Sequence, residues 1–508
     1  MGIEQKYHWL DGSLRAARLH PDKMFLNGMA TADRHSSAGL AFMGVLVLVG
    51  AAMQGYANRT VDAVTLAIFF LFAGYVAVTL VFSGKPAEQR AFLLCYAVCV
   101  LAGGLAQWYS LVVFDNPQST SDAISFFQII PDGHAYYTWW EINYLTVDGF
   151  PVSRGAPLAI AIWQGVYHFC SIMSMDYGTY IGVIVNALVI GLSGSLTVRT
   201  AREVFGDDTW RLRRVGILFA FCGLFILFGA VLLRDCFTTF FNALGLWGLV
   251  HWLCRPTPRN LLIALVLTGI SALAMAYLRL WSAVLFGFFW FVAFACWFLA
   301  KRLNMARLIA ILTALLLLSL ASQHLMNYID ASRGVQLQSL GRYADILAET
   351  SQGDSLGMAL LVGQPLPIRL ILGTGSRMIF PLPLWAYFHS GAADYHLIKG
   401  YHGIYQVLIM PLVLAGLFAI PQVLRKDRRG AIPLIFLAIY LIMSVEAVIA
   451  TSLEQRHIAQ FMPAFFILAA LPDTSNRNAR TAVRRVAIGW FAVVVLAHVA
   501  WVLAKVTA

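Results

Sequence analysis

The sequence predicts an all-α polytopic membrane protein. Hydrophobic residues make up 60% of the 508 residues and charged residues only 12%, and the mean hydropathy is +0.73. A soluble domain cannot cover that much apolar surface, whereas a bilayer accepts it. The apolar residues also fall into runs of about 17–22 residues, which is the length that a membrane-crossing helix requires.

About thirteen such runs are predicted to be transmembrane helices. They centre on residues 38–56, 62–83, 91–113, 178–198, 215–233, 237–254, 260–278, 281–300, 306–323, 402–423, 431–451, 458–471 and 486–504, of which 458–471 is the shortest. The apolar segment 158–172 must not cross if successive helices are to alternate in direction. We therefore expect it to lie at the membrane interface or to re-enter the membrane.

These spans define the predicted organisation of the chain. A cytoplasmic N-terminal arm covers 1–37, and a transmembrane core covers 38–323 and includes an acidic outer loop at 114–177. A second long outer loop follows at 324–401, and the C-terminal transmembrane helices occupy 402–508.

The distribution of charge predicts the orientation. With the N-terminus inside, about 25 of the 36 basic residues fall on the cytoplasmic side, as the positive-inside rule expects. The formal charge of +11 is thus explained by membrane topology, and nucleic acid is not expected as a partner. We predict a multi-pass protein of a bacterial inner membrane with a cytoplasmic N-terminus and an extracytoplasmic C-terminus.

Several classes of protein are disfavoured by absent patterns. The N-terminus has no apolar core of a cleavable signal, and no CxxC pair predicts a zinc site or a disulfide framework. The GxxxxGK[ST] phosphate-binding loop is absent, and no predicted cytoplasmic segment is long enough to form a nucleotide-binding domain. An ATP-driven pump and a nucleotide-sugar enzyme are therefore disfavoured.

The first outer loop contains the leading catalytic candidate, Asp122. The preceding Ser119-Thr120-Ser121 predicts a helix N-cap, AISFFQII predicts two helical turns, and Pro131-Asp132-Gly133 predicts their end. Asp122 in the first turn is explained equally well as a capping residue or as a general base that deprotonates a sugar hydroxyl.

Asp132 is the second catalytic candidate and lies beside possible sugar-binding residues. Its alternative is an ordinary turn aspartate. The side chains considered for substrate binding are His134, Tyr136, Tyr137 and Glu141. Most of the aromatic residues here are explained by the belt that marks a membrane interface.

Arginines at the predicted outer helix ends are candidates for binding phosphate. Arg234 and Arg279 lie at the mouths of hydrophobic hairpins, where an arginine without a partner is costly. Asp235 offers Arg234 a local partner, whereas Arg279 has no acidic neighbour in the sequence and has lipid phosphates as an alternative contact. Arg456 and His457 lie in a short outer link and serve either as phosphate ligands or as members of a self-paired turn.

Two other acidic groups need an explanation. Glu446 lies inside a predicted span, where a carboxylate is costly and is therefore a candidate for a site or a proton path. Asp207-Asp208 resembles the acidic pair of metal-dependent glycosyltransferases, but it lies among arginines on the predicted cytoplasmic side. We expect these two aspartates to form local ion pairs.

In combination, these segments resemble a known superfamily. The acidic loop SDAISFF…PDGHAYY, the hairpins LLRD and YLRLW, and the late segment SLEQRHIAQFMPAFFILAAL are similar to integral-membrane glycosyltransferases of the GT-C superfamily and to O-antigen-polymerase-like proteins. The resemblance covers most of the chain by layout. The chain departs from it by having three spans before the acidic loop and no DxD motif within that loop.

The resemblance implies transfer of a sugar from a polyprenyl phosphate or diphosphate carrier to a glycan or lipid acceptor, in the synthesis of a cell-envelope polysaccharide. It implies Asp122 or Asp132 as the base, and Arg234, Arg279 and Arg456 as ligands of the carrier phosphate. No cofactor is expected, although a requirement for a divalent metal is left open. The alternative is a transporter or flippase for a lipid-linked sugar or small solute.

Overall fold

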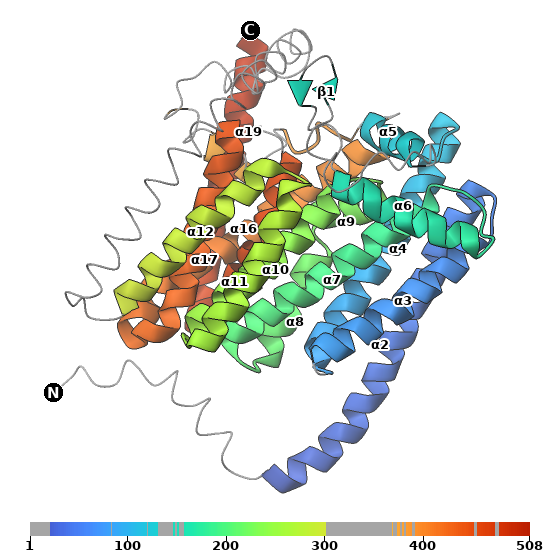
Figure 1. Cartoon of the computed structure of the whole chain (residues 1–508). Helices are drawn as coiled ribbons and strands as arrows, with labels where there is room; N and C mark the ends of the chain where they lie inside the picture. Colours follow the sequence, from blue (N-terminus) through green and yellow to red (C-terminus); the bar gives the residue numbers. More distant parts are fainter. Residues whose placement is uncertain are drawn as a thin grey trace, which may run out of the picture.

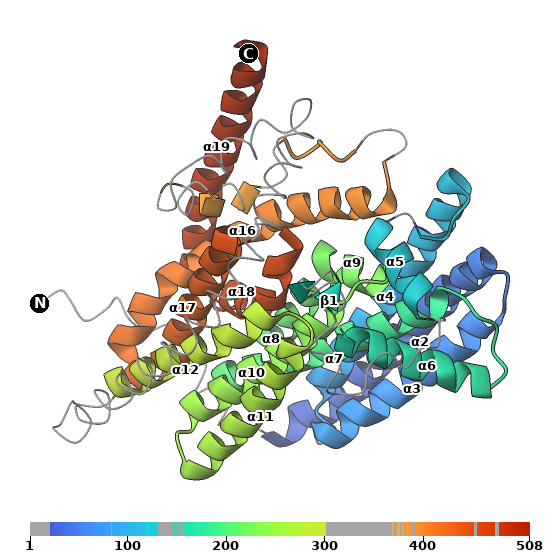
Figure 2. The same ribbon diagram turned by 45° about the horizontal axis from the view of Figure 1, so that its top comes forward.

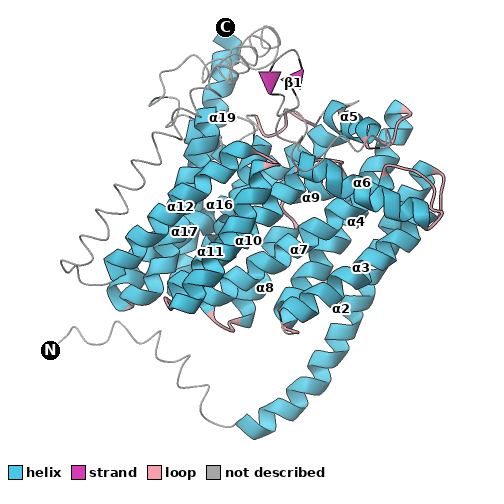
Figure 3. Ribbon diagram, viewed as in Figure 1, coloured by secondary structure: helices cyan, strands magenta, loops and turns pink. Residues whose placement is uncertain are grey.

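A computed structural model defines the architecture of the chain. It describes residues 21–82, 84–118, 120–130, 146–147, 150–151, 157–300, 368, 373–375, 378–379, 383–388, 392–451, 455–472 and 477–507. The described chain is almost entirely helical (Figure 3) and contains one pair of two-residue strands, in which β1 (Thr146–Val147) pairs antiparallel with β2 (Phe150–Pro151). The predicted all-α class is confirmed.

Helices of the first 300 residues form a bundle with one short helix at its edge (Figure 1). They are α2 (Pro21–Asn58), α3 (Asp62–Val81), α4 (Pro86–Phe114), α5 (Ser121–Ile129), α6 (Pro157–Ile172), α7 (Tyr180–Phe205), α8 (Thr209–Ala220), α9 (Gly223–Ala230), α10 (Asp235–Cys254), α11 (Pro258–Ala276) and α12 (Leu280–Ala300).

The C-terminal helices pack against this bundle. They are α16 (Asp394–Lys426), α17 (Arg428–Thr451), the 3₁₀-helix η5 (Gln455–Phe461), α18 (Met462–Ala470) and α19 (Arg477–Thr507). Helix α16 contacts α9, α18 and α19, and η5 contacts α10. The two parts of the chain thus share one hydrophobic core.

Eight helices among the described residues are long and apolar enough to cross a membrane, or nine if the bent pair α8–α9 counts as one span. The chain is therefore a multi-pass membrane protein. The predicted number of about thirteen is not confirmed, and the predicted span at 306–323 lies outside the described residues. The predicted span at 458–471 is divided between η5 and the nine-residue α18, and the helix predicted at 402–423 begins earlier, at Asp394.

The helix ends define two faces of the bundle. We call the face that carries α5, the α9–α10 and α11–α12 turns and η5 the α5 face, which lies at the top of Figure 1. We call the opposite face the basic face, because it holds Arg202, Arg214, Arg255 and the residues around the α16–α17 turn, including Arg428. Helix α6 belongs to the α5 face and, at about 24 Å, is shorter than the roughly 30 Å of bilayer hydrocarbon.

A buried ion-pair network fastens helices together near the basic face. Glu88 is fully buried and accepts two hydrogen bonds of 2.7 Å from Nε and Nη2 of Arg202, so α4 and α7 are joined by a bidentate pair. Glu203 lies 3.2 Å from Nδ1 of His251, which adds α10 to the network. Buried charges require such partners, since an isolated charge is costly away from water.

Helices α8 and α9 are bent by 55° relative to each other. The carbonyl oxygens at the end of α8 lie where a helix has no further amide donors of its own. The Tyr401 hydroxyl donates to Phe221 O at 2.9 Å, and the Tyr405 hydroxyl donates to Leu218 O. Helix α16 thus supplies the donors at the break.

Candidate functional site

Asp122 lies where the sequence predicted, in the first turn of α5. The Thr120 hydroxyl accepts a hydrogen bond from the Ala123 amide at 3.3 Å, so Thr120 is the N-cap, and the helix ends at Ile129. The predicted cap and two-turn helix are therefore confirmed. The Asp122 side chain does not make the cap bond and is 48% exposed at the α5 face.

Asp122 forms an ion pair with an arginine from the other part of the chain. Arg456 in η5 donates from Nη1 to Oδ2 of Asp122 at 2.7 Å. Charge-assisted hydrogen bonds of this length are stronger than neutral ones. The structure thus joins the predicted base to one of the predicted phosphate ligands, and it does not support a turn in which Arg456 is paired only with its neighbours in the sequence.

Arg234 interacts electrostatically with this pair and with Asp235. It is half-buried in the turn that joins α9 to α10. Burial lowers the pKa of its guanidinium, while Asp235 and Asp122 raise it and Arg456 lowers it. The Arg234 charge is thus within electrostatic reach of residues from α5, α10 and η5.

Asp235 pairs with Arg279 rather than with Arg234. Nη2 of Arg279 donates to Oδ1 of Asp235 at 2.9 Å, and the two side chains are only 14% and 4% exposed. Arg279 has no acidic neighbour in the sequence, and its partner comes from another helix, because antiparallel α10 and α11 return the chain to the same face 44 residues later. The local Asp235–Arg234 pair is likewise not the contact that forms.

We call Asp122, Arg234, Asp235, Arg279 and Arg456 the charge cluster. Three guanidinium groups and two carboxylates leave it with a formal charge of +1. The cluster joins the α5 helix, two interhelical turns and η5 at one face (Figures 1 and 2). Its chemistry fits an anionic ligand with a hydroxyl group near Asp122, since arginine matches phosphate and carboxylate geometry.

A buried amide, Gln460, fixes the position of η5 beneath the cluster. Its Oε1 accepts from Nδ2 of Asn242 in α10 at 2.8 Å and from the Ser282 hydroxyl in α12 at 3.1 Å. Its Nε2 donates to the carbonyl oxygen of His457 at 3.1 Å. These three residues were missed by the sequence analysis, although an amide inside the apolar run IAQFMPAFF was a usable indication.

A second set of hydrogen bonds holds the turn that carries Arg234. Nδ2 of Asn186 donates to the carbonyl oxygens of Val231 and Leu233 at 3.0 and 3.2 Å. The indole Nε1 of Trp163 in α6 donates to Oδ1 of Asn186 at 2.9 Å. The short helix α6 is therefore connected, through one buried amide, to the backbone next to Arg234.

The remaining predicted site residues have different outcomes. Asp132, His134, Tyr136, Tyr137 and Glu141 lie outside the described residues, so their roles stay predictions. His457 is half-buried in η5, directly beside Arg456.

Glu446 and the two aspartates at 207–208 make hydrogen bonds and ion pairs to residues outside the charge cluster. The Thr374 hydroxyl donates to Oε1 of Glu446 at 2.8 Å. Asp207 pairs with Arg202, and Asp208 caps α8 by accepting from the Arg211 amide at 3.1 Å. The prediction of local charge pairing for these aspartates is confirmed.

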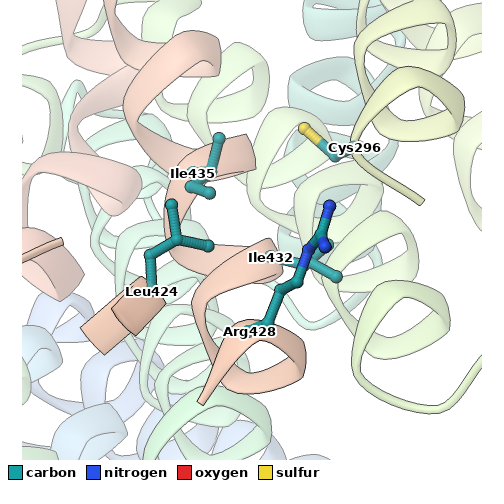
Figure 4. A pocket seen from close by; sticks show the side chains of 5 residues that line it. All are labelled: Cys296, Leu424, Arg428, Ile432 and Ile435. Atoms are coloured by element: carbon teal, nitrogen blue, oxygen red, sulfur yellow. The ribbon is translucent and has the colours of Figure 1, made fainter. Parts of the chain in front are cut away.

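Within the described ranges, no group of three or more His, Cys, Asp or Glu side chains is placed to hold a metal ion. A groove of about 340 Å³ lies at the basic-face end of the bundle, lined by Cys296, Leu424, Arg428, Ile432 and Ile435 (Figure 4). Its lining offers no general base, so we do not assign the chemistry to it.

Comparisons with known proteins do not identify a relative. No protein-family model matches the chain, and no curated protein shows significant similarity to it. The resemblance to GT-C glycosyltransferases therefore remains a prediction.

Proposed function

We propose that the chain is an integral-membrane glycosyltransferase or polymerase that uses a sugar carried on a polyprenyl phosphate or diphosphate. The acceptor is a glycan or lipid of the cell envelope. One observation carries the proposal. A carboxylate, Asp122, and three arginines from four separate segments gather on the α5 face, and the arginine nearest the carboxylate is 334 residues away in the sequence.

In the proposed reaction Asp122 accepts the proton of the acceptor hydroxyl. The hydroxyl oxygen then forms a bond to the anomeric carbon of the donor sugar, and the bond from that carbon to the carrier phosphate breaks. The electron pair leaves with the phosphate, whose charge Arg234, Arg279 and Arg456 stabilise. Because a diphosphate is a good leaving group, positioning and charge stabilisation are the main demands on the protein.

The proposed location of this reaction is the extracytoplasmic side of a bacterial inner membrane. The basic face carries the arginine-rich helix ends, and the positive-inside rule assigns such ends to the cytoplasm. The α5 face then opens to the side where carrier-linked sugars are consumed. No nucleotide is required at that face, in keeping with the absence of a nucleotide-binding motif.

The test is transfer by the purified protein in lipid nanodiscs, supplied with polyprenyl-linked sugars and candidate acceptors. We expect a glycosylated acceptor with the wild type and loss of product with Asp122→Asn, and Asp132→Asn is compared in parallel. Unchanged turnover in both variants would refute the assignment of the catalytic base. Absence of product with every lipid-linked donor would refute the proposal that the protein is a glycosyltransferase.

A transporter or flippase is the second candidate, favoured by the 55° bend between α8 and α9. Broken helices that expose backbone groups to a substrate are a feature of transporters. In this chain, however, the Phe221 carbonyl and the Leu218 carbonyl at the break accept tyrosine hydroxyls from α16. Movement of a fluorescent lipid-linked sugar across proteoliposomes, without acceptor glycosylation, would favour the transporter.

A further inference from the structure

In the Asp122–Arg456 ion pair, the proposed base and one of the proposed phosphate ligands bind each other. The Oδ2 atom of Asp122 accepts the Arg456 Nη1–H at 2.7 Å, so this oxygen is engaged and is not positioned to take a proton from a hydroxyl. The same Nη1–H is a donor that a phosphate oxygen would use. Asp122 and a phosphate ligand therefore compete for Arg456.

We propose that the Asp122–Arg456 pair is an exchangeable lock, in which a phosphate group that binds to Arg456 displaces Asp122 and frees its carboxylate. Its use as a control on catalysis rests on the proposed function, because only there does Asp122 act as the base. The exchange itself is a property of anion binding. The pair engages one of the two carboxylate oxygens of Asp122, so the full acceptor capacity of Asp122 depends on a bound donor that releases this oxygen.

The exposure of the two pairs in the cluster distinguishes the exchangeable one from the fixed one. The Asp122 side chain is 48% exposed and that of Arg456 is 19% exposed. In the Asp235–Arg279 pair these fractions are 4% and 14%. Exposed ion pairs contribute little net free energy, whereas breaking a buried pair leaves an uncompensated charge. The Asp122–Arg456 pair is thus the one that a ligand can open.

Phosphate is a suitable competitor for this arginine. A phosphate group presents several oxygens to a guanidinium fork, and a diphosphate also carries more charge than a carboxylate. Arg234 lies within electrostatic reach of both Arg456 and Asp122, and the cluster has a formal charge of +1. An incoming phosphate therefore gains a second cation when it replaces Asp122.

The backbone on both sides of the pair is held independently of it. Phe126 packs against Trp163 at 5.2 Å between ring centroids, and the Tyr177 hydroxyl donates to the carbonyl oxygen of Phe127 at 3.2 Å. Gln460 holds η5 through α10 and α12. Opening the pair therefore requires rotation of two side chains and leaves α5 and η5 in place.

The test is a double-mutant cycle on anion binding by the full-length protein in nanodiscs. Three probes are used, namely inorganic pyrophosphate, a polyprenyl phosphate, and phosphatidylglycerol as a phosphate-bearing lipid without a polyprenyl chain. We expect Asp122→Asn to tighten binding by about 3- to 10-fold, since the competitor is removed, and Arg456→Gln to weaken it. In the Arg456→Gln background the gain from Asp122→Asn should vanish.

Two controls separate exchange from other effects. Asp115→Asn removes another exposed carboxylate from the α5 face and should leave binding unchanged. Arg456→Lys keeps the charge without the bidentate fork and should bind with intermediate affinity, which covers the case in which Arg456→Gln does not fold.

Wild-type affinity in Asp122→Asn would overturn the lock. So would a gain that persists undiminished beside Arg456→Gln, because simple repulsion by Asp122 would then explain it. Absence of binding by all three probes would also overturn it. The probe whose tighter binding to Asp122→Asn depends on Arg456 identifies the source of the phosphate. The expected binding pattern with no glycosyl transfer would refute the proposed function and retain the lock.

Discussion

Nη1 of Arg456 lies 2.7 Å from Oδ2 of Asp122, across a sequence separation of 334 residues. The contact joins a short helix at the edge of the first bundle to a 3₁₀-helix near the end of the chain. It is possible because η5 packs against α10 and because α5 is held on α6 by aromatic contacts. The charge cluster therefore requires both parts of the chain.

Asp122→Asn should lower sugar transfer by about 100-fold or more, since a general base contributes 10²–10⁴ in rate. The amide preserves the size of the side chain but cannot accept the proton. Initial rates with a polyprenyl-linked donor measure the effect. Asp115→Asn is the matched control, because Asp115 has a left-handed backbone (φ 53°) that asparagine tolerates; it should stay within twofold of wild type, and an equal loss in both variants would refute the assignment.

Arg279→Met should destabilise the folded protein by about 3 kcal/mol, because it leaves the buried Asp235 carboxylate without its partner at 2.9 Å. Replacing both residues, as Asp235→Leu with Arg279→Met, should restore part of that loss. Reversible unfolding in mixed detergent micelles measures the free energy. A double variant that is less stable than either single variant would argue against a paired role.

Gln460→Met should reduce transfer by lowering kcat, and should also destabilise the fold by about 1–3 kcal/mol, because the Asn242 amide and the Ser282 hydroxyl lose a buried acceptor. The side chain does not belong to the charge cluster, so the loss would act through the position of Arg456. Gln460→Glu retains the oxygen that accepts from Asn242 and Ser282 and should recover part of kcat. Wild-type kcat in Gln460→Met would mean that η5 is held by other contacts.

Glu88→Gln should destabilise the protein by about 3 kcal/mol while the residual folded protein keeps its specific activity. The carboxylate is fully buried and bound by two hydrogen bonds of 2.7 Å from Arg202, so a neutral amide there leaves the Arg202 guanidinium with only its exposed partner, Asp207. Asp208→Asn serves as the control, because asparagine is also a good N-cap and should change stability by less than about 0.5 kcal/mol. Thermal unfolding followed by fluorescence compares the two.

A membrane-impermeant thiol reagent applied to intact cells should label a cysteine placed on the α5 face and should not label one placed on the basic face. Ser125→Cys lies on an exposed position of α5, and Arg213→Cys on an exposed position of α8. The native background is low, since six of the seven cysteines are buried and Cys254 is half-buried. We expect labelling of Ser125→Cys only; labelling of Arg213→Cys alone would reverse the proposed orientation.

The sequence was sufficient to predict the membrane class, the cap of α5 and four of the five members of the charge cluster as candidates. These predictions rest on local features, namely apolar length, a Thr-Ser-Asp cap and arginines at helix ends. The ion-pair partners of these residues were not predictable from local features of the sequence. Asp235 has an arginine beside it in the sequence, yet its bond is to Arg279, because the geometry of two antiparallel helices decides which guanidinium can reach the carboxylate.

The same reason explains the groups that were missed. Gln460 is an isolated amide in an apolar run of the sequence. Its role in holding η5 depends on hydrogen bonds from Asn242 and Ser282, which belong to two other helices. Glu88 was not singled out, because one acid after a proline is an ordinary helix start. Its burial against Arg202 arises only when α4 and α7 pack side by side.

The bend between α8 and α9 has a consequence for the biogenesis of the protein. The donors that satisfy Phe221 O and Leu218 O come from Tyr401 and Tyr405, which are 180 and 187 residues further along the chain. A ribosome makes the bent segment long before it makes these tyrosines, and unsatisfied carbonyls are costly in lipid. These two hydrogen bonds can form only after α16 has been synthesised, so we expect the bend to reach its final geometry when the C-terminal helices dock.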